Sequence, residues 1–272
     1  MVFEFLFNPK RAERRPYEMF FVGIFYSILA VVLSIWVFHE QSSLVMVFLT
    51  VIACVHLIHG VIQMEEEKDI EIQDEGILIK EHGKALAFFM FLFMGFVVGY
   101  LMSYIFLPTE ITSKLFQVQQ ATISEINSKI SGGVIAGLPI LMKILLNNIK
   151  VLVFCLLFSL FYGSGAIFIL SWNASVIATA MGNVVKLTIE KGLFFSILYA
   201  FGRYMTHGIF EIAAYFIAGL AGGIISVAII KHDFGSDKFV HVLTDSIDLI
   251  VLSVVVLVVG AIVEVYVTPV LF

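Results

Sequence analysis

The chain has 272 residues, of which 60% are apolar and 14% are charged, and its formal net charge is −5. A typical soluble domain is about 45–50% apolar, and a water-soluble fold of this composition would expose large apolar patches. The two cysteines, Cys54 and Cys155, exclude a disulfide-rich secreted scaffold. With 16 basic against 21 acidic residues there is no basic surface for nucleic acid. The composition therefore predicts an all-α integral membrane protein.

The charged residues are clustered, and the stretches between the clusters are long enough to cross a bilayer. About 20 apolar residues span the hydrocarbon core as a helix. On this basis five spans are predicted, at residues 19–38, 44–64, 85–107, 207–230 and 247–268. A sixth span begins near Val151, and we expect it to end at the polar interruption Ser171-Trp172-Asn173.

The next apolar stretch has two interpretations. Residues 174–185 and 193–201 are apolar, but each is too short to cross the bilayer alone, and the polar segment 186–192 separates them. We expect a re-entrant pair of half-helices, which is tolerated where protein covers the backbone ends. The alternative is one short span followed by an interfacial helix, so that the total is six or seven transmembrane helices.

The basic residues near the N-terminus predict the orientation of the chain. Lys10, Arg11, Arg14 and Arg15 directly precede the first span, and the positive-inside rule places such a segment in the cytoplasm. That span is 20 residues long and no small-residue cleavage site follows it, so we expect it to be retained rather than removed as a signal peptide. The sequence thus predicts a multi-pass protein of the cell membrane with a cytoplasmic N-terminus.

Segment 65–84 is acidic and follows the second span, which places it in the cytoplasm. Ile70 and Ile72 alternate with acids before a turn, and Ile77 and Ile79 alternate again after it. This alternation is typical of a small β-hairpin, which we predict here. A solvated acidic loop is the alternative.

The long segment after the third span lies on the outer side in this topology. Residues 109–131 are polar and free of Gly and Pro, which predicts a helix that Gly132 and Gly133 then break. Residues 139–150 resume as an amphipathic helix, which we expect to lie at the membrane surface.

Ionisable residues inside the predicted spans are costly and need a structural or functional reason. Arg203, His207 and Glu211 recur every four residues, so they share one face of a continuous helix. One interpretation is an intrahelical column of ion pairs. The other is a site at which His207 prepares Glu211 to handle a proton or a cation. Glu264 is the one acid in the last span, and we expect it to hydrogen-bond to a neighbouring helix near His207.

Three asparagines complete the candidate intramembrane polar cluster. Asn147 and Asn148 precede the span that starts near Val151, where side-chain capping is favourable, and Asn173 lies at its expected end. Capping is the simplest role for the first two.

The sequence contains no HExxH motif, no nucleophile elbow and no P-loop. His207 and Glu211 offer two metal ligands at i and i+4, but a catalytic zinc site needs three protein ligands. Glu264 supplies the third only if the tertiary fold brings it there. A membrane metal-dependent hydrolase is therefore an alternative, while our expectation is a chain without catalytic residues or a cofactor.

Small residues recur at the spacing that lets transmembrane helices approach closely. The pairs are Gly95 with Gly99 in the third span and Gly219 with Gly223 in the fifth. These pairs predict a tightly packed bundle, and they are compatible with a homodimer.

The polar markers appear in an order that is similar to a known family. They are Asn147-Asn148, Asn173, His207-Gly208 with Glu211, and Glu264 with Thr268-Pro269. This succession resembles the stage II sporulation protein M family of multi-pass membrane proteins, over residues 85–272. The chain departs from the family pattern at Asn173-Ala174, where the family often has Asn-Gly, and at Thr206, where Pro often precedes His-Gly.

The resemblance implies a membrane component of a larger complex. In spore-forming bacteria the namesake works beside separate hydrolase subunits in a complex that remodels peptidoglycan during engulfment, and the family also occurs in organisms that form no spores. It supplies no established catalytic residues to carry over. We accordingly divide the chain into an N-terminal two-helix module with the acidic hairpin, residues 1–84, and a family-like membrane domain, residues 85–272.

Two hypotheses for the function follow. The first is a non-enzymatic scaffold or assembly subunit whose partners are other membrane or envelope proteins, or a second copy of the chain. The second is a channel or transporter that uses the intramembrane residues Arg203, His207, Glu211 and Glu264.

Overall fold

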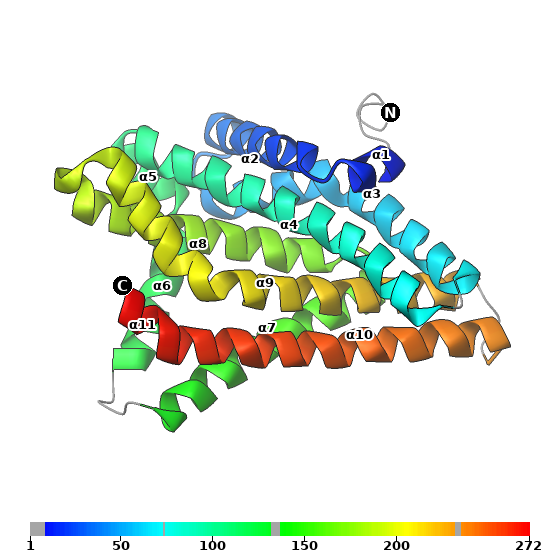
Figure 1. The fold of residues 1–272 in the computed structure, drawn as a ribbon. Coiled ribbons are helices and arrows are strands. Elements are labelled where there is room, and N and C mark those ends of the chain that lie inside the picture. Colours follow the sequence, from blue (N-terminus) through cyan, green and yellow to red (C-terminus); the bar gives the residue numbers. More distant parts are fainter. Residues whose placement is uncertain (1–8, 73, 132–136, 232–234) are drawn as a thin grey trace.

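The computed structural model describes residues 9–72, 74–131, 137–231 and 235–272, and all regular structure in those ranges is helical (Figure 1). Seven of the described helices are long and apolar enough to cross a bilayer. They are α2 (Glu18–Val37), α3 (Ser42–Glu71), α4 (Glu75–Phe106), α7 (Leu138–Tyr162), α8 (Ala166–Thr188), α9 (Leu193–Lys231) and α10 (Asp237–Ile262). The shorter elements are α1 (Pro9–Arg14), α5 (Thr109–Leu115), α6 (Gln117–Ser131), a 3₁₀ turn (Ile189–Lys191), a π turn (Val263–Val267) and α11 (Thr268–Leu271). The all-α membrane class is confirmed.

The span predicted from Val151 to Asn173 is wrong, because the chain turns earlier. The turn is made by Gly163-Ser164-Gly165, and Gly163 has a φ of +68°, which residues with a side chain rarely adopt. A Cβ atom on Gly165 would lie 2.2 Å from the carbonyl oxygen of Phe158. These glycines, and not the polar segment 171–173, end α7. The polar segment lies inside α8.

The predicted pair of re-entrant half-helices is also wrong. Residues 174–185 belong to the continuous helix α8, and residues 193–201 form the beginning of α9, which is 39 residues long. The 3₁₀ turn and Gly192, whose φ is +99°, connect the two helices. The polar residues of 186–192 therefore mark a turn between two full helices, which brings the number of candidate spans among the described residues to seven.

The described residues of segment 65–84 form the end of one helix and the beginning of the next, so the predicted β-hairpin is wrong. α3 continues to Glu71, and α4 begins at Glu75. Asp74 caps α4, because its side chain accepts a hydrogen bond from the backbone nitrogen of Ile77 at 3.0 Å. Glu and Lys are good helix formers, and ion pairs three residues apart support both helices. The short isoleucine alternation does not outweigh these helical preferences.

The helix predicted at residues 109–131 is confirmed, with a break at Phe116 between α5 and α6. The amphipathic segment 139–150 is helical as predicted, but it is the first half of α7 and not a separate helix. Gly132 and Gly133, which we expected to break the outer helix, lie outside the described residues.

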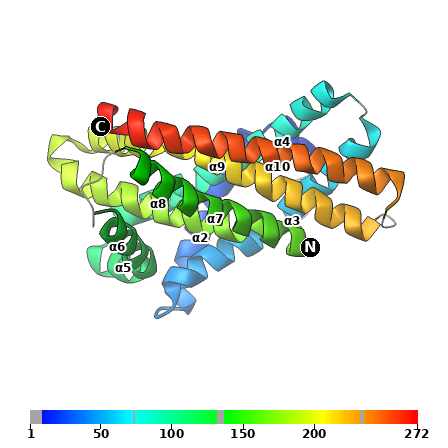
Figure 2. The same ribbon diagram turned by 90° about the horizontal axis from the view of Figure 1, so that it is seen from below.

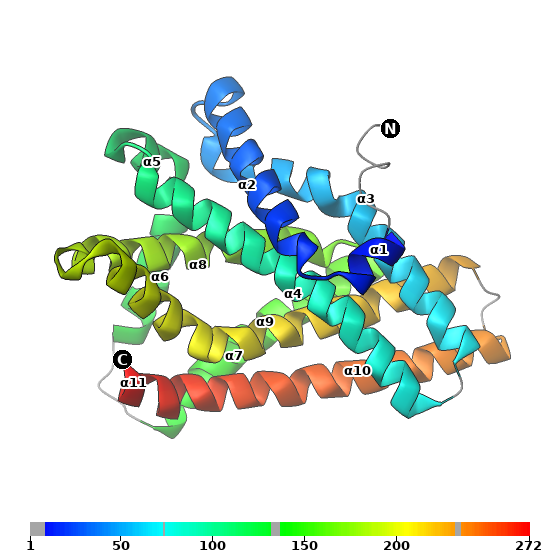
Figure 3. The same cartoon turned by 45° about the horizontal axis from the view of Figure 1, so that its top comes forward.

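α4 and α9 form the middle of the bundle, with α2 and α3 on one side and α10 on the other (Figures 1 and 3). α5 and α6 lie at one end of the bundle, and the beginnings of α4 and α10 lie at the other (Figures 1 and 2). This second end is rich in charged residues, and we call it the charged end.

Glycines bring the helices together as predicted. A Cβ atom on Gly95 would lie 2.3 Å from the Phe20 carbonyl oxygen of α2, and one on Gly219 would lie 2.8 Å from Cβ of Ala166 in α8. A Cβ atom on Gly99 would lie 2.0 Å from the Ser27 hydroxyl. A Cβ atom on Gly223 would lie 2.9 Å from the carbonyl oxygen of Gly163 and 2.9 Å from Cγ2 of Ile62 in α3. The predicted close helix approach thus occurs inside one chain.

Candidate functional site

Two glutamates from different elements meet in the apolar part of the bundle. Glu211 lies on α9 and Glu264 on the π turn after α10, and their carboxyl groups are hydrogen-bonded to each other. Because a carboxylate accepts hydrogen bonds but cannot donate them, this bond requires a proton on one of the two groups. Asn148 of α7 donates from Nδ2 to Glu211 Oε1 over 2.6 Å. We call Glu211 and Glu264 the carboxyl pair.

A small residue allows α10 to approach α9 at this point. A Cβ atom on Gly260 would lie 3.2 Å from Cγ of Glu211 and 3.2 Å from Cβ of Phe210. Gly260 is one turn before Glu264 on the same chain segment. The absence of a side chain at Gly260 therefore positions the two carboxyl groups within reach of each other.

The π turn that carries Glu264 has a cause in the sequence. Pro269 lacks a backbone N–H, and its ring clashes with the carbonyl group four residues earlier, so a regular α-helix cannot continue through it. The Thr268 hydroxyl donates instead to the carbonyl oxygen of Val263 at 3.2 Å. π turns are rare and recur at functional sites. The Thr-Pro end of the chain thus shapes the backbone around one member of the carboxyl pair.

His207 contributes a second link between α9 and the C-terminal segment. Its Nδ1 lies 3.1 Å from the hydroxyl oxygen of Thr268. Arg203, one turn earlier, is exposed. Of the three residues that we placed on one helix face, His207 and Glu211 are bonded to other elements, so the column interpretation does not describe their contacts.

The asparagines have different surroundings from those predicted. Asn148 lies ten residues after the start of α7 and bonds to Glu211, so the prediction that it caps a helix is wrong. Asn147 is exposed on the same helix. Asn173 is half-buried inside α8 and ends no helix. The structure thus brings Asn148, but not Asn147, to the carboxyl pair.

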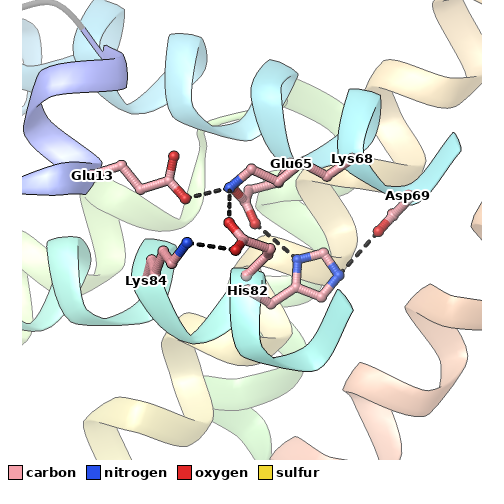
Figure 4. Close-up of polar contacts among 7 residues, drawn as sticks. Glu13, Glu65, Lys68, Asp69, His82 and Lys84 are labelled. Atoms are coloured by element: carbon pink, nitrogen blue, oxygen red, sulfur yellow. Dashed lines mark hydrogen bonds and ion pairs between the residues drawn. The ribbon is translucent and has the colours of Figure 1, made fainter. Parts of the chain in front are cut away.

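The charged end holds a second polar cluster, separate from the carboxyl pair. Figure 4 shows its members, which come from α1, α3 and α4. They are Glu13, Glu65, Lys68, Asp69, Glu81, His82 and Lys84. We call them the ion-pair cluster.

Lys68 is the centre of the ion-pair cluster. Its Nζ lies 2.7 Å from Glu65 Oε1 and 3.5 Å from Glu81 Oε2, and it also bonds to Glu13 of α1 (Figure 4). Burial raises the pKa of the Glu13 carboxyl, and the hydrogen bond from Lys68 opposes that rise. One ammonium group therefore joins three carboxylates from three helices.

His82 lies between two carboxylates that are fully buried. Its Nδ1 is 2.8 Å from Glu65 Oε2, and its Nε2 is 3.0 Å from Asp69 Oδ1 (Figure 4). An imidazole that faces an acceptor with each nitrogen is suited to the doubly protonated, cationic form. The contact with Asp69 is an ion pair without hydrogen-bond geometry, so both Asp69 oxygens are buried without a hydrogen-bond donor among the described residues.

Lys231 extends this network to the end of α9. Its Nζ lies 2.9 Å from Oε2 of Glu66, which is fully buried, and 3.2 Å from Oε1 of Glu67. Removing one partner of a buried ion pair leaves an uncompensated charge and costs about 3–5 kcal/mol. The ion pairs therefore hold α1, α3, α4 and α9 in fixed positions at the charged end.

The ion-pair cluster is not predicted by the sequence pattern of segment 65–84. Its signal was present as oppositely charged residues three apart, Glu65 with Lys68 and Glu81 with Lys84, which is a helical spacing. The alternating isoleucines of the same segment favour a hairpin, which conflicts with this helical spacing. No local pattern indicates that His82 faces Glu65, because that contact joins two helices.

The helices and the carboxyl pair define an integral membrane protein with a polar centre inside its apolar bundle. The model of the stage II sporulation protein M family matches residues 85–269, which is more than half of the chain, and the chain belongs to that family. The resemblance found in the sequence is thereby confirmed. Comparison with curated proteins and with solved structures finds no match.

The matched region contains the carboxyl pair, together with Asn148, His207 and Thr268. It begins at residue 85, so α1, α2, α3 and the ion-pair cluster precede it. The division of the chain into modules 1–84 and 85–272 stays a prediction. α2 nevertheless packs directly on α4 through Gly23 and Gly95.

Proposed function

We propose that this protein is a non-enzymatic assembly subunit of a membrane or envelope complex, located in the cell membrane with its N-terminus in the cytoplasm. The observation that carries the proposal is the network of ion pairs that ties α1, α3, α4 and α9 together at the charged end. A surface that is rigid before binding loses less conformational freedom when a partner docks.

The lengths of the helices support the same proposal. α3 and α4 have 30 and 32 residues, and their charged segments, 65–71 and 75–84, lie at the charged end, whereas about 20 residues suffice to cross the hydrocarbon core. The excess length extends the charged end beyond the apolar region. In the orientation predicted by the positive-inside rule, this polar body faces the cytoplasm.

Purification from native membranes tests the proposal. The tagged full chain, extracted in mild detergent, is expected to bring down a membrane or envelope protein in fixed stoichiometry. Lys231→Met, which removes the link between α9 and α3, is expected to reduce the recovery of that partner. Lys114→Met, an exposed change at the opposite end of the bundle, is the matched control. Repeated recovery of the chain alone would contradict the proposal.

A second copy of the chain is the other partner that we propose to test. The glycines that we had associated with a homodimer pack against helices of the same chain, so a dimer would use a different surface. The mass of the purified particle in detergent, measured by light scattering, distinguishes a homodimer from a complex with another protein.

The second candidate function is a channel or transporter for protons or cations. The carboxyl pair favours it, because two carboxyl groups that share one proton inside an apolar bundle are a typical arrangement of a proton-handling site. Flux into liposomes by the wild type is expected to be lost in Glu211→Gln. If no gradient of protons or monovalent cations produces flux, the transport function is excluded.

A further inference from the structure

A small cavity lies at the charged end between α4 and α10. Its volume is about 180 Å³, and it is lined by Leu78, Ile79, His82, Asp245, Asp248, Leu249 and Leu252. Whole small-molecule ligands usually occupy about 300–1,000 Å³, so this cavity matches a smaller group. Its size points to a single side chain or a short aliphatic molecule.

The lining of the cavity combines apolar walls with acids. On α10, Asp245, Asp248 and Leu252 recur at helical spacing and therefore share one face. Leu78 and Ile79 of α4 form the opposite wall, with Leu78 buried and Ile79 exposed. A ligand that matches these walls has an aliphatic stem that ends in a cationic group.

A buried carboxylate oxygen without a hydrogen-bond partner among the described residues points to a missing donor in the cavity. Asp245 Oδ2 has no hydrogen-bond partner among the described residues, although His241 lies 3.6 Å away. His82 also lines the cavity, but both of its nitrogens face carboxylates, those of Glu65 and Asp69, so its positive charge is compensated within the ion-pair cluster. Buried polar atoms normally have partners, and those that lack them need an explanation.

The charges around the cavity favour a cation. The cavity and the adjoining ion-pair cluster contain six carboxylates against three cationic groups. The acids are Glu13, Glu65, Asp69, Glu81, Asp245 and Asp248, and the cations are Lys68, His82 and Lys84. Acids remain in excess even when His241 is counted as a cation.

We propose that this cavity receives a lysine side chain of a partner protein, with the aliphatic stem against Leu78, Ile79 and Leu252 and the ammonium group between Asp245 and Asp248. The inference rests on the proposed assembly function and specifies the chemistry of one docking point. The ammonium group of a phosphatidylethanolamine headgroup fits less well, because its stem is only two carbons long and ends in an anionic phosphate that the surrounding acids repel.

Binding of n-pentylammonium to the purified full chain in a neutral detergent tests the chemistry of the cavity. This cation has the ammonium group and four-carbon stem of a lysine side chain, with a fifth carbon in place of Cα. It is expected to raise the melting temperature and to show saturation transfer by NMR. The neutral n-pentanol and the anionic pentanoate, which have the same stem, are expected to do neither. Equal effects of pentylammonium and pentanol overturn the proposal.

Two variants locate the binding. The double change Asp245→Asn with Asp248→Asn is expected to weaken pentylammonium binding roughly tenfold or more, since it removes two charge-assisted contacts. Leu252→Trp fills the cavity while both acids remain, and it is expected to abolish binding. Glu71→Gln changes an exposed acid at the same end and is expected to leave the affinity unchanged. Unchanged affinity in both cavity variants overturns the proposal.

Lipid nanodiscs separate the two sources of an ammonium group. In phosphatidylcholine nanodiscs, added phosphatidylethanolamine is expected to leave pentylammonium binding unchanged, and competition by this lipid overturns the assignment to a lysine. A recovered partner without pentylammonium binding overturns the inference alone. Pentylammonium binding without any recovered partner overturns the proposed assembly function, and with it the assignment to a partner's lysine.

Discussion

The carboxyl pair and the ion-pair cluster satisfy buried carboxylates in different ways. Glu211 and Glu264 bond to each other and to the amide of Asn148. Glu65 bonds to two cationic groups, Lys68 and His82, from its own helix and from its neighbour. In the apolar bundle a shared proton limits the buried charge, and at the charged end Glu65 keeps its negative charge, which Lys68 and His82 compensate. Buried glutamates are therefore stabilised by a shared proton in one region and by cationic side chains in the other.

The largest expected effect is at the ion-pair cluster. Lys68→Met removes the ammonium group that joins Glu13, Glu65 and Glu81, and it leaves three carboxylates facing one another. We expect the free energy of unfolding, measured by titration with a denaturing detergent in mixed micelles, to fall by about 3 kcal/mol. Lys80→Met, an exposed change on α4, is expected to have little effect. Equal stability of the two variants would mean that the cluster does not hold the helices together.

A smaller loss of unfolding free energy is expected where α10 approaches α9 at the carboxyl pair. Gly260→Ala places a methyl group 3.2 Å from Glu211 Cγ and separates α10 from α9. The free energy of unfolding is expected to fall by about 1–3 kcal/mol. Gly83→Ala on α4 has no atom within 4 Å of the added methyl, and it is expected to stabilise the helix by about 0.5–1 kcal/mol. A neutral result for Gly260→Ala would contradict the close approach.

The smallest expected effect concerns the bond between α9 and the C-terminal segment. Thr268→Val removes the hydroxyl that lies 3.1 Å from His207 Nδ1 and also bonds to the Val263 carbonyl. The loss of one net hydrogen bond is expected to cost about 0.5–1.5 kcal/mol. In the Thr268→Val background, His207→Ala is expected to cause little further loss of unfolding free energy, because the bond between the two residues is already absent. A double-mutant cycle therefore measures the contribution of this bond. Full additivity of the two changes would contradict the contact.

The fold class was predictable because it depends on composition and on the length of apolar stretches. Five of the predicted spans lie within long helices of the structure, to within one residue at their ends. The errors occurred where local patterns were interpreted without tertiary context. The Ser171-Trp172-Asn173 segment is polar but stays helical, while Gly163 and Gly165 make the turn through backbone geometry.

The candidate site was predictable in part. Intramembrane acids are rare, so Glu211 and Glu264 were identified from their position alone, and the spacing of His207 and Glu211 placed them on one helix face. That Asn148 and not Asn147 contacts Glu211 depends on how α7 is rotated, which only the packing determines. The bond of His207 to Thr268 depends on the π turn.

The most direct test of the two ways of satisfying a carboxylate is the same amide substitution in each region. Glutamine at position 264 donates a hydrogen bond to Glu211 in place of the shared proton, so Glu264→Gln is expected to change the free energy of unfolding by less than about 1 kcal/mol. Glutamine at position 65 turns a donor toward Lys68 or His82, so Glu65→Gln is expected to lower it by about 3 kcal/mol. Equal losses in the two variants, or a larger loss in Glu264→Gln, would contradict the account.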